Sequence, residues 1–282
     1  MQLGHWQLDT VRGGDFWLDG GVMFGVVPKT LWGKQAAADE LNRVRISCHS
    51  VLARNGQQTI LLDTGYGGKF AGLDRKFYSL EAGEPVVDSL AALGVRPAEI
   101  DVVLFSHLHF DHAGGATRFG AAGELELVFP RARFIAGRLE WEDAMSGAPE
   151  LGGAYSDDNL RPLADSGRLE LIEDGAEIAP GLRAILSGGH TRGHLSIEFS
   201  SGQETAIFLG DICPSRWHAR RMWCLSYDQF PLETRRRKMQ LLGEAADRQA
   251  WVLWSHDAEV AASRILRHPK REFVIGDSLA RL

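Results

Sequence analysis

The chain of 282 residues contains only three cysteines, Cys48, Cys213 and Cys224. They are odd in number and scattered, and none forms a Cys-x-x-Cys pair, so a disulfide framework and a zinc site made of thiolates are both excluded. The chain also lacks any run of about 18 apolar residues, which is the length that a membrane-spanning helix needs. Residues 1–21 mix charge, glycine and aromatic residues where a signal peptide needs a continuous apolar stretch. We therefore expect a cytoplasmic protein without a membrane partner.

An excess of positive charge is absent as well. The 31 Lys and Arg residues are outnumbered by 37 Asp and Glu residues, which gives a net charge of −6. This balance argues against nucleic acid as the main partner. The one dense basic run, residues 235–238, lies in a segment with a helical pattern, where a solvated helix face explains it. Apolar residues make up 44% of the chain, which is typical of a globular protein.

Short apolar runs alternate with segments of helical periodicity, which indicates an α/β fold. We expect strands over 59–62, 101–105, 206–209 and 251–254, and helices over 85–93, 140–145 and 232–246. Three of these strands, and a fourth over 184–186, run directly into polar residues of the types that bind metals. Strand ends in a layered α/β protein converge along one edge, where such folds place their sites. The four ends are therefore expected to meet at one point in a single domain over residues 1–282.

The strongest motif is the segment 106–115, Ser-His-Leu-His-Phe-Asp-His-Ala-Gly-Gly. Alternate residues of an extended segment face the same way, so His107, His109 and Asp111 can point into one cavity. His112 can approach the same place from the other side, where the chain leaves the strand. Imidazole and carboxylate groups together suit zinc or a neighbouring divalent metal.

Three further ligands follow at long range, because His190, Asp211 and His256 each stand just after an expected strand. Seven side chains exceed what one tetrahedral zinc uses, but they suit two metals that share a carboxylate. The expected division places His107, His109 and His190 on one metal and Asp111, His112 and His256 on the other, with Asp211 between them. Zinc is the leading candidate, and manganese, iron and cobalt remain alternatives.

The order His-x-His-x-Asp-His, followed by distant His, Asp and His, resembles the metallo-β-lactamase superfamily. The resemblance includes Leu-Leu-Asp-Thr-Gly at 61–65 and extends from about residue 45 to 258. It implies an α/β fold of the αβ/βα sandwich type, with two mixed β-sheets flanked by helices and a dinuclear site at one edge. Residues 19–32 and 223–231 are similar to the quorum-quenching N-acyl-homoserine-lactonase-like branch. We expect residues 1–44 to cap the pocket or to contact a second subunit in a homodimer.

Two departures from that branch stand out. Lactonases of the best-known type carry a tyrosine three residues after the bridging aspartate, where this chain has Pro214. Tyr227, from a later loop, is the candidate to replace it. The superfamily's Gly-His-Thr-Pro-Gly-His has Arg192 in place of proline, which adds a charge near the mouth of the site.

The expected enzyme uses two cations to lower the pKa of a shared water, so that a metal-bridging hydroxide attacks the substrate near neutral pH. The leading reaction is the opening of a lactone ring, with N-acyl homoserine lactone as the first candidate substrate. The alternative is hydrolysis of an organophosphate triester or an aryl ester, since methyl-parathion-hydrolase-like relatives share the ligands. Asp111 and Asp211 are the expected catalytic carboxylates, and Asp63 and His194 are expected to hydrogen-bond the ligating imidazoles.

Specificity is expected to come from loops around the metals. One set of side chains is predicted to form an apolar wall for an acyl chain, and another to form the rim: Met23, Phe24, Trp32 and Phe70 in the wall, and Trp217, His218, Trp223 and Tyr227 in the rim. The competing interpretation is that these residues form the core or a subunit contact. A nuclease of this superfamily would need a basic stripe and an inserted domain, and a metal-free binding module would not keep all seven ligands.

Overall fold

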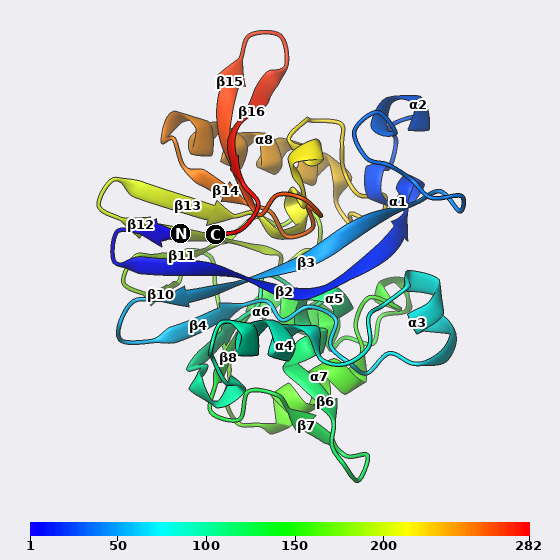
Figure 1. Ribbon diagram of the computed structural model, residues 1–282, viewed down its shortest axis with the longest axis vertical. Helices are drawn as coiled ribbons and strands as arrows, with labels where there is room; N and C mark the ends of the chain where they lie inside the picture. The colour runs from blue at the N-terminus through cyan, green and yellow to red at the C-terminus, as the bar shows by residue number, and fades with distance from the viewer.

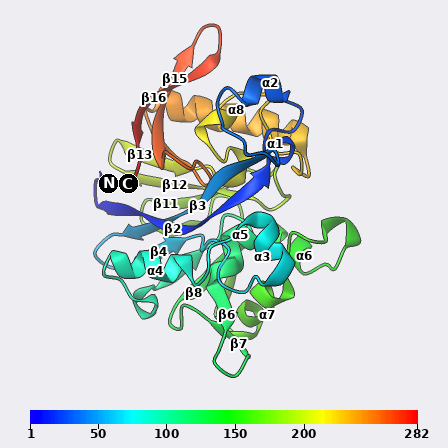
Figure 2. The same ribbon diagram turned by 45° about the vertical axis from the view of Figure 1, so that its right-hand side comes forward.

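Two β-sheets pack face to face, and helices cover their outer sides (Figures 1 and 2). The computed structural model describes residues 1–282, except for the side chain of Asp74. The mixed two-sheet sandwich predicted from the sequence is confirmed. Each of the strands and helices expected above is present, with ends that differ by at most two residues.

The first sheet has seven strands in the order β1-β2-β3-β4-β5-β8-β9. The strands from β1 to β4 are antiparallel, and those from β4 to β9 are parallel. Their bounds are β1 Gln2–Leu3, β2 Trp6–Asp19, β3 Arg43–Arg54, β4 Thr59–Leu62, β5 Val102–Leu104, β8 Arg133–Gly137 and β9 Leu169–Ile172.

The second sheet follows the chain order from β10 to β16, and only the pair β13 and β14 is parallel. Its bounds are β10 Glu177–Ala179, β11 Leu182–Leu186, β12 Leu195–Ser201, β13 Glu204–Phe208, β14 Trp251–Leu253, β15 Ala262–His268 and β16 Glu272–Leu279. A separate hairpin joins β6 Thr117–Phe119 to β7 Leu125–Leu127.

The helices are short, except for the last. Their bounds are α1 Gly20–Phe24, α2 Lys29–Trp32, α3 Gly72–Tyr78, α4 Pro85–Ala92, α5 Phe110–Ala113, α6 Arg138–Ala144, α7 Asp157–Asp165 and α8 Pro231–Asp247. Figures 1 and 2 show α8 outside the second sheet, and α4 and α7 on the opposite side, outside the first sheet. None of the described helices combines the length and the apolar character needed to cross a bilayer.

In the central strands, apolar residues point to both faces of the sheet, which is why both faces are covered. Ile60 and Leu62 face the second sheet, whereas Leu61 between them faces α4 and α7. Ala206 and Phe208 likewise join the core between the sheets, whereas Ile207 faces α8. Since burial of one such large side chain is worth about 1.5–3 kcal/mol, the alternation fixes both the layers and the strand register.

The N-terminal segment, residues 1–44, was expected to cap the pocket or to contact a second subunit, and this role stays a prediction. Its first half is strand β2, which pairs with β3 along its whole length and is an integral part of the first sheet. The strand was missed because Gly13 and Gly14 interrupt its apolar alternation, at a register shift between Arg12 and Asp15. A Cβ on Gly13 would lie 2.5 Å from Cα of Gly65, so glycine is required where β2 crosses the 63–65 turn.

Candidate metal centre

The loops that follow β5, β11, β13 and β14 meet at one edge of the sandwich. The parallel pairs β4–β5 and β13–β14 both end there, one pair from each sheet. The extended segment after β5 stops at His109, where the chain turns into α5, so Asp111 and His112 reach the centre from a helix. All seven predicted ligands are buried and lie at this edge: His107, His109, Asp111, His112, His190, Asp211 and His256.

The first group consists of His107, His109 and His190, as the sequence grouped them. One ring nitrogen of each lies within 4.8 Å of the other two. Nδ1 of His109 is 3.1 Å from Nε2 of His190. Nε2 of His107 is buried and has no hydrogen-bond partner. A buried imidazole nitrogen without a partner costs folding free energy unless a cation or a hydrogen-bond donor binds its lone pair.

The second group contains Asp111, His112 and His256. Nε2 of His112 lies 3.0 Å from Nε2 of His256, and Oδ2 of Asp111 lies 3.4 Å from the same His256 atom. The thiol of Cys48 is a buried neighbour, with Sγ within 4.8 Å of ligand atoms of Asp111 and His256. Spacing along the chain gave no sign of this proximity, because Cys48 comes from β3.

Asp211 stands between the two groups. Its Oδ1 is 3.1 Å from Nε2 of His256 and 3.3 Å from Nε2 of His112, and its Oδ2 is 3.6 Å from Nε2 of His190. One carboxylate oxygen therefore faces each group. Together with the unpartnered nitrogen of His107 and the close imidazole pairs, this donor set fits two divalent cations that share Asp211.

The surroundings shift the pKa values of the ligands in both directions. Burial, followed by the neighbouring histidines, lowers the pKa of His107 and of His109, so both imidazoles are neutral as metal ligation requires. Although burial acts in the opposite direction, Asp211 and then Asp111 raise the pKa of His256 to about 9. Burial likewise opposes the shift at Asp211, but His256 and His112 lower the pKa of its carboxyl well below the ordinary value. The carboxylates thus favour positive charge in the second group.

Asp63 lies where the sequence placed it, beside a predicted ligand. Its carboxylate is 2.8 Å from Nδ1 of His112 and accepts hydrogen bonds of 2.7 Å from the backbone N–H and the hydroxyl of Ser106. The backbone of Asp63 has a φ of 57°, in the left-handed region. These bonds hold the ring of His112 with Nε2 toward Asp211.

His194 differs from its predicted role, because the structure gives it no hydrogen bond to a ligating imidazole. Its Nε2 accepts a hydrogen bond of 2.9 Å from the backbone N–H of Asp211, and its Nδ1 lies 2.6 Å from Oγ of Ser187. Burial lowers the pKa of His194 well below its ordinary value, which suits an accepting Nε2. His194 therefore holds Asp211, the aspartate between the two groups, by a hydrogen bond to the backbone N–H of Asp211.

Sequence reasoning missed other groups that orient the ligands. Oδ1 of Asp228 lies 2.9 Å from Nδ1 of His190, and the carbonyl of Ser47 lies 3.0 Å from Nδ1 of His256. Ser255 donates a hydrogen bond of 3.0 Å to Asp211. Asp228 lies inside the 223–231 segment that resembles the lactonase-like branch, so the sequence contained a signal for it.

An apolar cleft of about 380 Å³ opens above the centre, with His109 and Asp111 in its lining. Tyr227 lines it too, and its ring centroid is 5.5 Å from that of His190. The apolar wall comes mainly from β2, α1, α3 and α5: Phe16, Leu18, Val22, Phe77, Tyr78 and Phe110. None of these six side chains was predicted for the wall, although three of them come from the N-terminal segment.

Four predicted pocket residues are instead buried in a core cluster and are not in the cleft lining: Met23, Phe24, Trp32 and His218. Phe24 stacks on Trp32 and on His218, at centroid distances of 5.0 and 5.4 Å. Nε2 of His218 donates to the carbonyl of Met23 at 2.9 Å. The prediction was wrong because residues 22–32 pack against residues 217–226, which bury each other's aromatic side chains; Trp217 and Trp223 belong to the same cluster. Phe70 lines an adjoining hollow, where its ring packs 5.2 Å from that of Phe110.

Arg192 does not add a free charge to the mouth of the site. Its guanidinium pairs with Asp143 at 2.6 Å and with Glu142 at 3.4 Å, both on α6. The departure from proline therefore ties the His190 loop to a helix.

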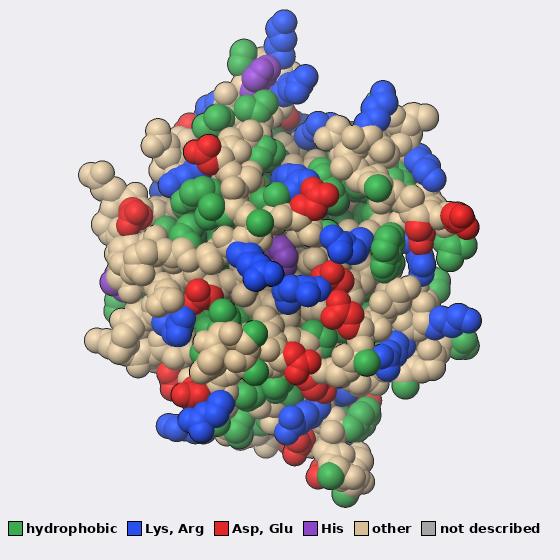
Figure 3. Space-filling model, in the orientation of Figure 1, with side chains coloured by type: hydrophobic (Ala, Val, Ile, Leu, Met, Phe, Trp, Pro, Cys, Tyr) green, Lys and Arg blue, Asp and Glu red, His purple; other side chains and the backbone are tan. Residues whose placement is uncertain are grey.

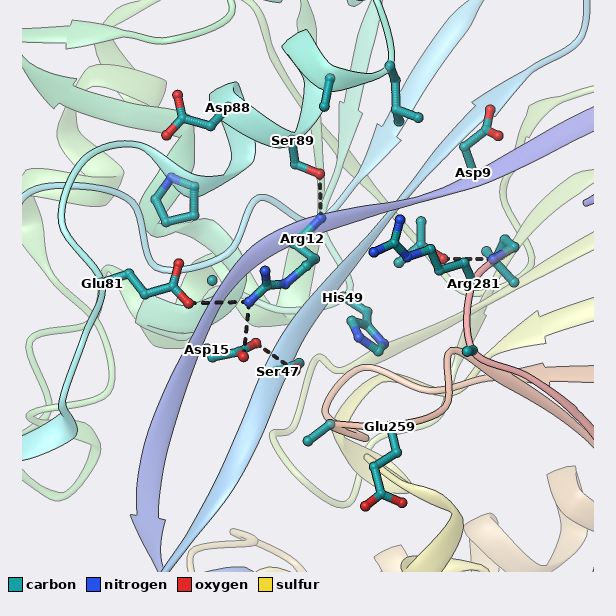
Figure 4. Close-up of a pocket in the computed structure, with 18 of the residues that line it drawn as sticks. Asp9, Arg12, Asp15, Ser47, His49, Glu81, Asp88, Ser89, Glu259 and Arg281 are labelled. Carbon is teal, nitrogen blue, oxygen red and sulfur yellow. Dashed lines mark hydrogen bonds and ion pairs between the residues drawn. The ribbon is translucent and has the colours of Figure 1, made fainter.

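A larger hollow, of about 640 Å³, lies elsewhere, against the strands β2 and β3 (Figure 4). Three of its charges pair with one another, since Arg12 lies 2.9 Å from Asp15 and 3.2 Å from Glu81. The described groups of potential metal ligands all lie elsewhere. On the face that Figure 3 shows, basic and acidic side chains are interspersed and no continuous basic stripe crosses it.

Comparisons with known proteins agree with this geometry. The family model described as the metallo-beta-lactamase superfamily matches residues 43–223. An N-acyl homoserine lactonase from Bacillus thuringiensis is 29% identical over 124 residues, a match that covers 44% of this chain and 42% of the lactonase. The chain thus matches less than half the length of that relative.

Solved structures match over nearly the whole chain. A probable metal-dependent hydrolase from Staphylococcus aureus has a TM-score of 0.91 and 31% identity, and the match covers 99% of this chain and 98% of that one. A protein described as a dizinc quorum-quenching lactonase in complex with its product has a TM-score of 0.79 at 21% identity, over 99% and 97% of the two chains, and shows the fold alone. The family model matches more than half of the chain, and the hydrolase from Staphylococcus aureus is similar over nearly its full length. The chain therefore belongs to the metallo-β-lactamase superfamily and is related to its metal-dependent hydrolases.

Proposed function

We propose that this chain is a dinuclear metal-dependent hydrolase that opens a lactone ring, with N-acyl homoserine lactones as its substrate class. The observation that carries the proposal is the arrangement of two ligand groups on either side of Asp211, beneath an apolar cleft that His109 and Asp111 line. The relative from Bacillus thuringiensis, which is named as an N-acyl homoserine lactonase, supports the choice of substrate.

The two cations would be held by separate sets of side chains. His107, His109 and His190 would hold one, Asp111, His112 and His256 would hold the other, and Asp211 would contact both. When bound, two divalent ions supply a hydroxide near neutral pH and an electrophile for the carbonyl oxygen of the substrate. Zinc suits imidazole and carboxylate ligands best, with manganese, iron and cobalt as the alternatives.

The chain's own residues then orient the reaction. Asp63 and Asp228 fix the rings of His112 and His190 through their outer nitrogens. The carboxylate of Asp111, which lines the cleft, accepts the proton of the hydroxyl that has added to the carbonyl carbon and passes it to the alkoxide oxygen that leaves as the ring opens. The phenol of Tyr227 donates a hydrogen bond to the substrate carbonyl, in place of the tyrosine that Pro214 replaces.

The cleft suits a neutral substrate with an apolar tail. Its volume of about 380 Å³ lies in the range of small-molecule sites, and its apolar wall provides the surface that an acyl chain would bury. Asp19 and Glu150 also line it, so an anionic substrate would meet like charges.

An aryl ester or an organophosphate triester is the second candidate. The ring centroids of Tyr78 and Phe110 lie 5.5 Å apart, and those of Phe16 and Phe110 lie 6.0 Å apart, so the wall offers aromatic faces to an aryl leaving group.

A hydrolysis assay separates the two candidates. The zinc-loaded protein is tested on an acyl-homoserine lactone, on γ-butyrolactone and on paraoxon, with His109→Ala as the inactive variant and His5→Ala, at an exposed site, as the matched control. Turnover of the lactone that rises with acyl length supports the proposal. Turnover of paraoxon alone would assign the protein to the triester hydrolases.

A further inference from the structure

Glu140, on α6, is a buried carboxylate outside the metal ligands, with 1% of its surface exposed. Burial raises the pKa of its carboxyl, and three hydrogen-bond donors act in the opposite direction. A carboxylate at such depth is stable only where donors replace its lost water. The positions of those donors show which loops the side chain of Glu140 connects.

Each donor to Glu140 comes from the surroundings of the three-histidine group. The backbone N–H of Leu108, between His107 and His109, donates to Oε1 at 3.0 Å. The hydroxyl of Tyr155 donates to the same oxygen at 3.0 Å, and its ring lies 5.3 Å from that of His109. The hydroxyl of Thr191, next to His190, donates to Oε2. One side chain therefore joins the loop from the first sheet to the loop from the second.

The backbone of α6 is fitted to the same loop. A Cβ on Gly193 would lie 2.0 Å from the backbone nitrogen of Glu140, so only glycine allows this approach. The pair between Arg192 and Asp143 closes a second connection, one turn further along α6. Residues 191–193 are thus held against α6 on both sides of Glu140.

We propose that Glu140 is a positioning residue that sets the spacing between the His107–His109 loop and the His190 loop, and thereby the metal affinity of the three-histidine group. The inference rests on the proposed metal centre. Without the carboxylate, Leu108 and Thr191 lose their common acceptor, and the loops of the two sheets are no longer joined at this point. The second group is not joined through Glu140, so its affinity is expected to stay unchanged.

Cobalt binding tests this role without an activity assay. The protein is loaded with Co²⁺, and the dissociation constants are measured by titration with a chelator while the visible absorption bands report ligand geometry. Glu140→Ala is expected to weaken one of two cobalt sites by about 10- to 100-fold, the range for lost supporting partners of metal ligands, and to shift the bands of that site. Glu140→Gln keeps the Oε1 acceptor for Leu108 and Tyr155, and is expected to restore most of the affinity.

Arg138→Ala is the matched control, since Arg138 lies on the same helix, is exposed and pairs with Glu173 rather than with the His190 loop. It is expected to bind cobalt as the wild type does. Should Glu140→Ala fail to fold, Thr191→Val removes one donor and is expected to weaken the same site by a smaller factor. Thermal unfolding of the metal-free variants identifies a merely structural role: a lower melting temperature with unchanged cobalt affinity and spectrum would overturn the inference. A wild-type protein that binds no cobalt would overturn the proposed centre, and this inference with it.

Discussion

Nδ1 of His190 lies 2.9 Å from Oδ1 of Asp228, and both side chains are buried. The contact fixes the ring with Nε2 toward His109 and Asp211. Asp228 comes from the loop that also carries Tyr227, so the same loop orients a ligand and lines the cleft.

Asp228→Ala is expected to lower metal affinity by about 10- to 100-fold, because the ring of His190 loses the partner that orients it. Asp228→Asn keeps an oxygen that can accept a hydrogen bond from Nδ1 of His190. Its metal affinity is expected to lie between those of the wild type and Asp228→Ala. Chelator titration of the zinc-loaded proteins measures both. Wild-type affinity in Asp228→Ala would show that the contact does not support the centre.

Tyr227→Phe is expected to lower kcat for an acyl-homoserine lactone by about 100-fold, as loss of one donor to a developing oxyanion does. The metal content should not change, because the phenol is not in either ligand group. Steady-state kinetics and elemental analysis provide the two measurements. An unchanged kcat would show that Tyr227 does not take over the role of the tyrosine that lactonases carry at the position of Pro214.

His218 predicts a dependence of stability on pH. Burial lowers the pKa of this imidazole from 6.5 to about 3 in the folded protein. Below pH 6.5 the unfolded chain binds a proton that the folded chain refuses, so the free energy of unfolding falls as the pH drops toward 3. Between pH 7.5 and pH 5, the loss from His218 is about 2 kcal/mol.

Urea unfolding of wild type and His218→Gln at the two pH values isolates this contribution. The variant is expected to be less stable than the wild type at pH 7.5, because it loses the stacking of His218 on Phe24 and the hydrogen bond to Met23. It is expected to lose less stability than the wild type when the pH falls to 5. Equal losses in the two proteins would show that His218 is protonated in the folded state.

Phe77 lines the cleft from α3 and has 65% of its surface exposed, so its truncation is expected to affect binding more than folding. Phe77→Ala should raise KM for long-chain lactones by about 5-fold, which corresponds to roughly 1 kcal/mol of lost apolar contact. KM for γ-butyrolactone, which has no acyl chain, should stay the same. Phe119→Ala, at an exposed position in β6 outside the cleft lining, is the control. An equal rise in KM for both substrates would mean that Phe77 does not contact the acyl chain of the lactone.

The ligand groups could be predicted from the sequence because metal chemistry needs particular residue types at strand ends. His107 and His256 are 149 residues apart, yet each directly follows a run of buried strand residues. The α/β class followed from the alternation of apolar runs with helical segments, and the sandwich from the resemblance to the superfamily. Strand β2 was missed because its two glycines interrupt its apolar alternation at a bulge.

The cleft wall could not be predicted in the same way. Phe24 and Phe16 have the same chemistry, and only packing decides that Phe24 is enclosed by Trp32 and His218 whereas Phe16 faces the cleft. Contacts between segments distant in sequence also decide the partners of Glu140 and Asp228. Composition and periodicity do not determine such contacts, because they depend on how two loops from different sheets meet.

Metal content is the most direct test of the shared centre. The protein is reloaded with zinc, dialysed and measured by elemental analysis, alongside Asp211→Ala and the exposed-site control His5→Ala. Two zinc ions per chain in the wild type and the control, with both ions weakened in Asp211→Ala, are the expected result. Fewer than one ion per chain in the reloaded wild type would contradict the dinuclear centre.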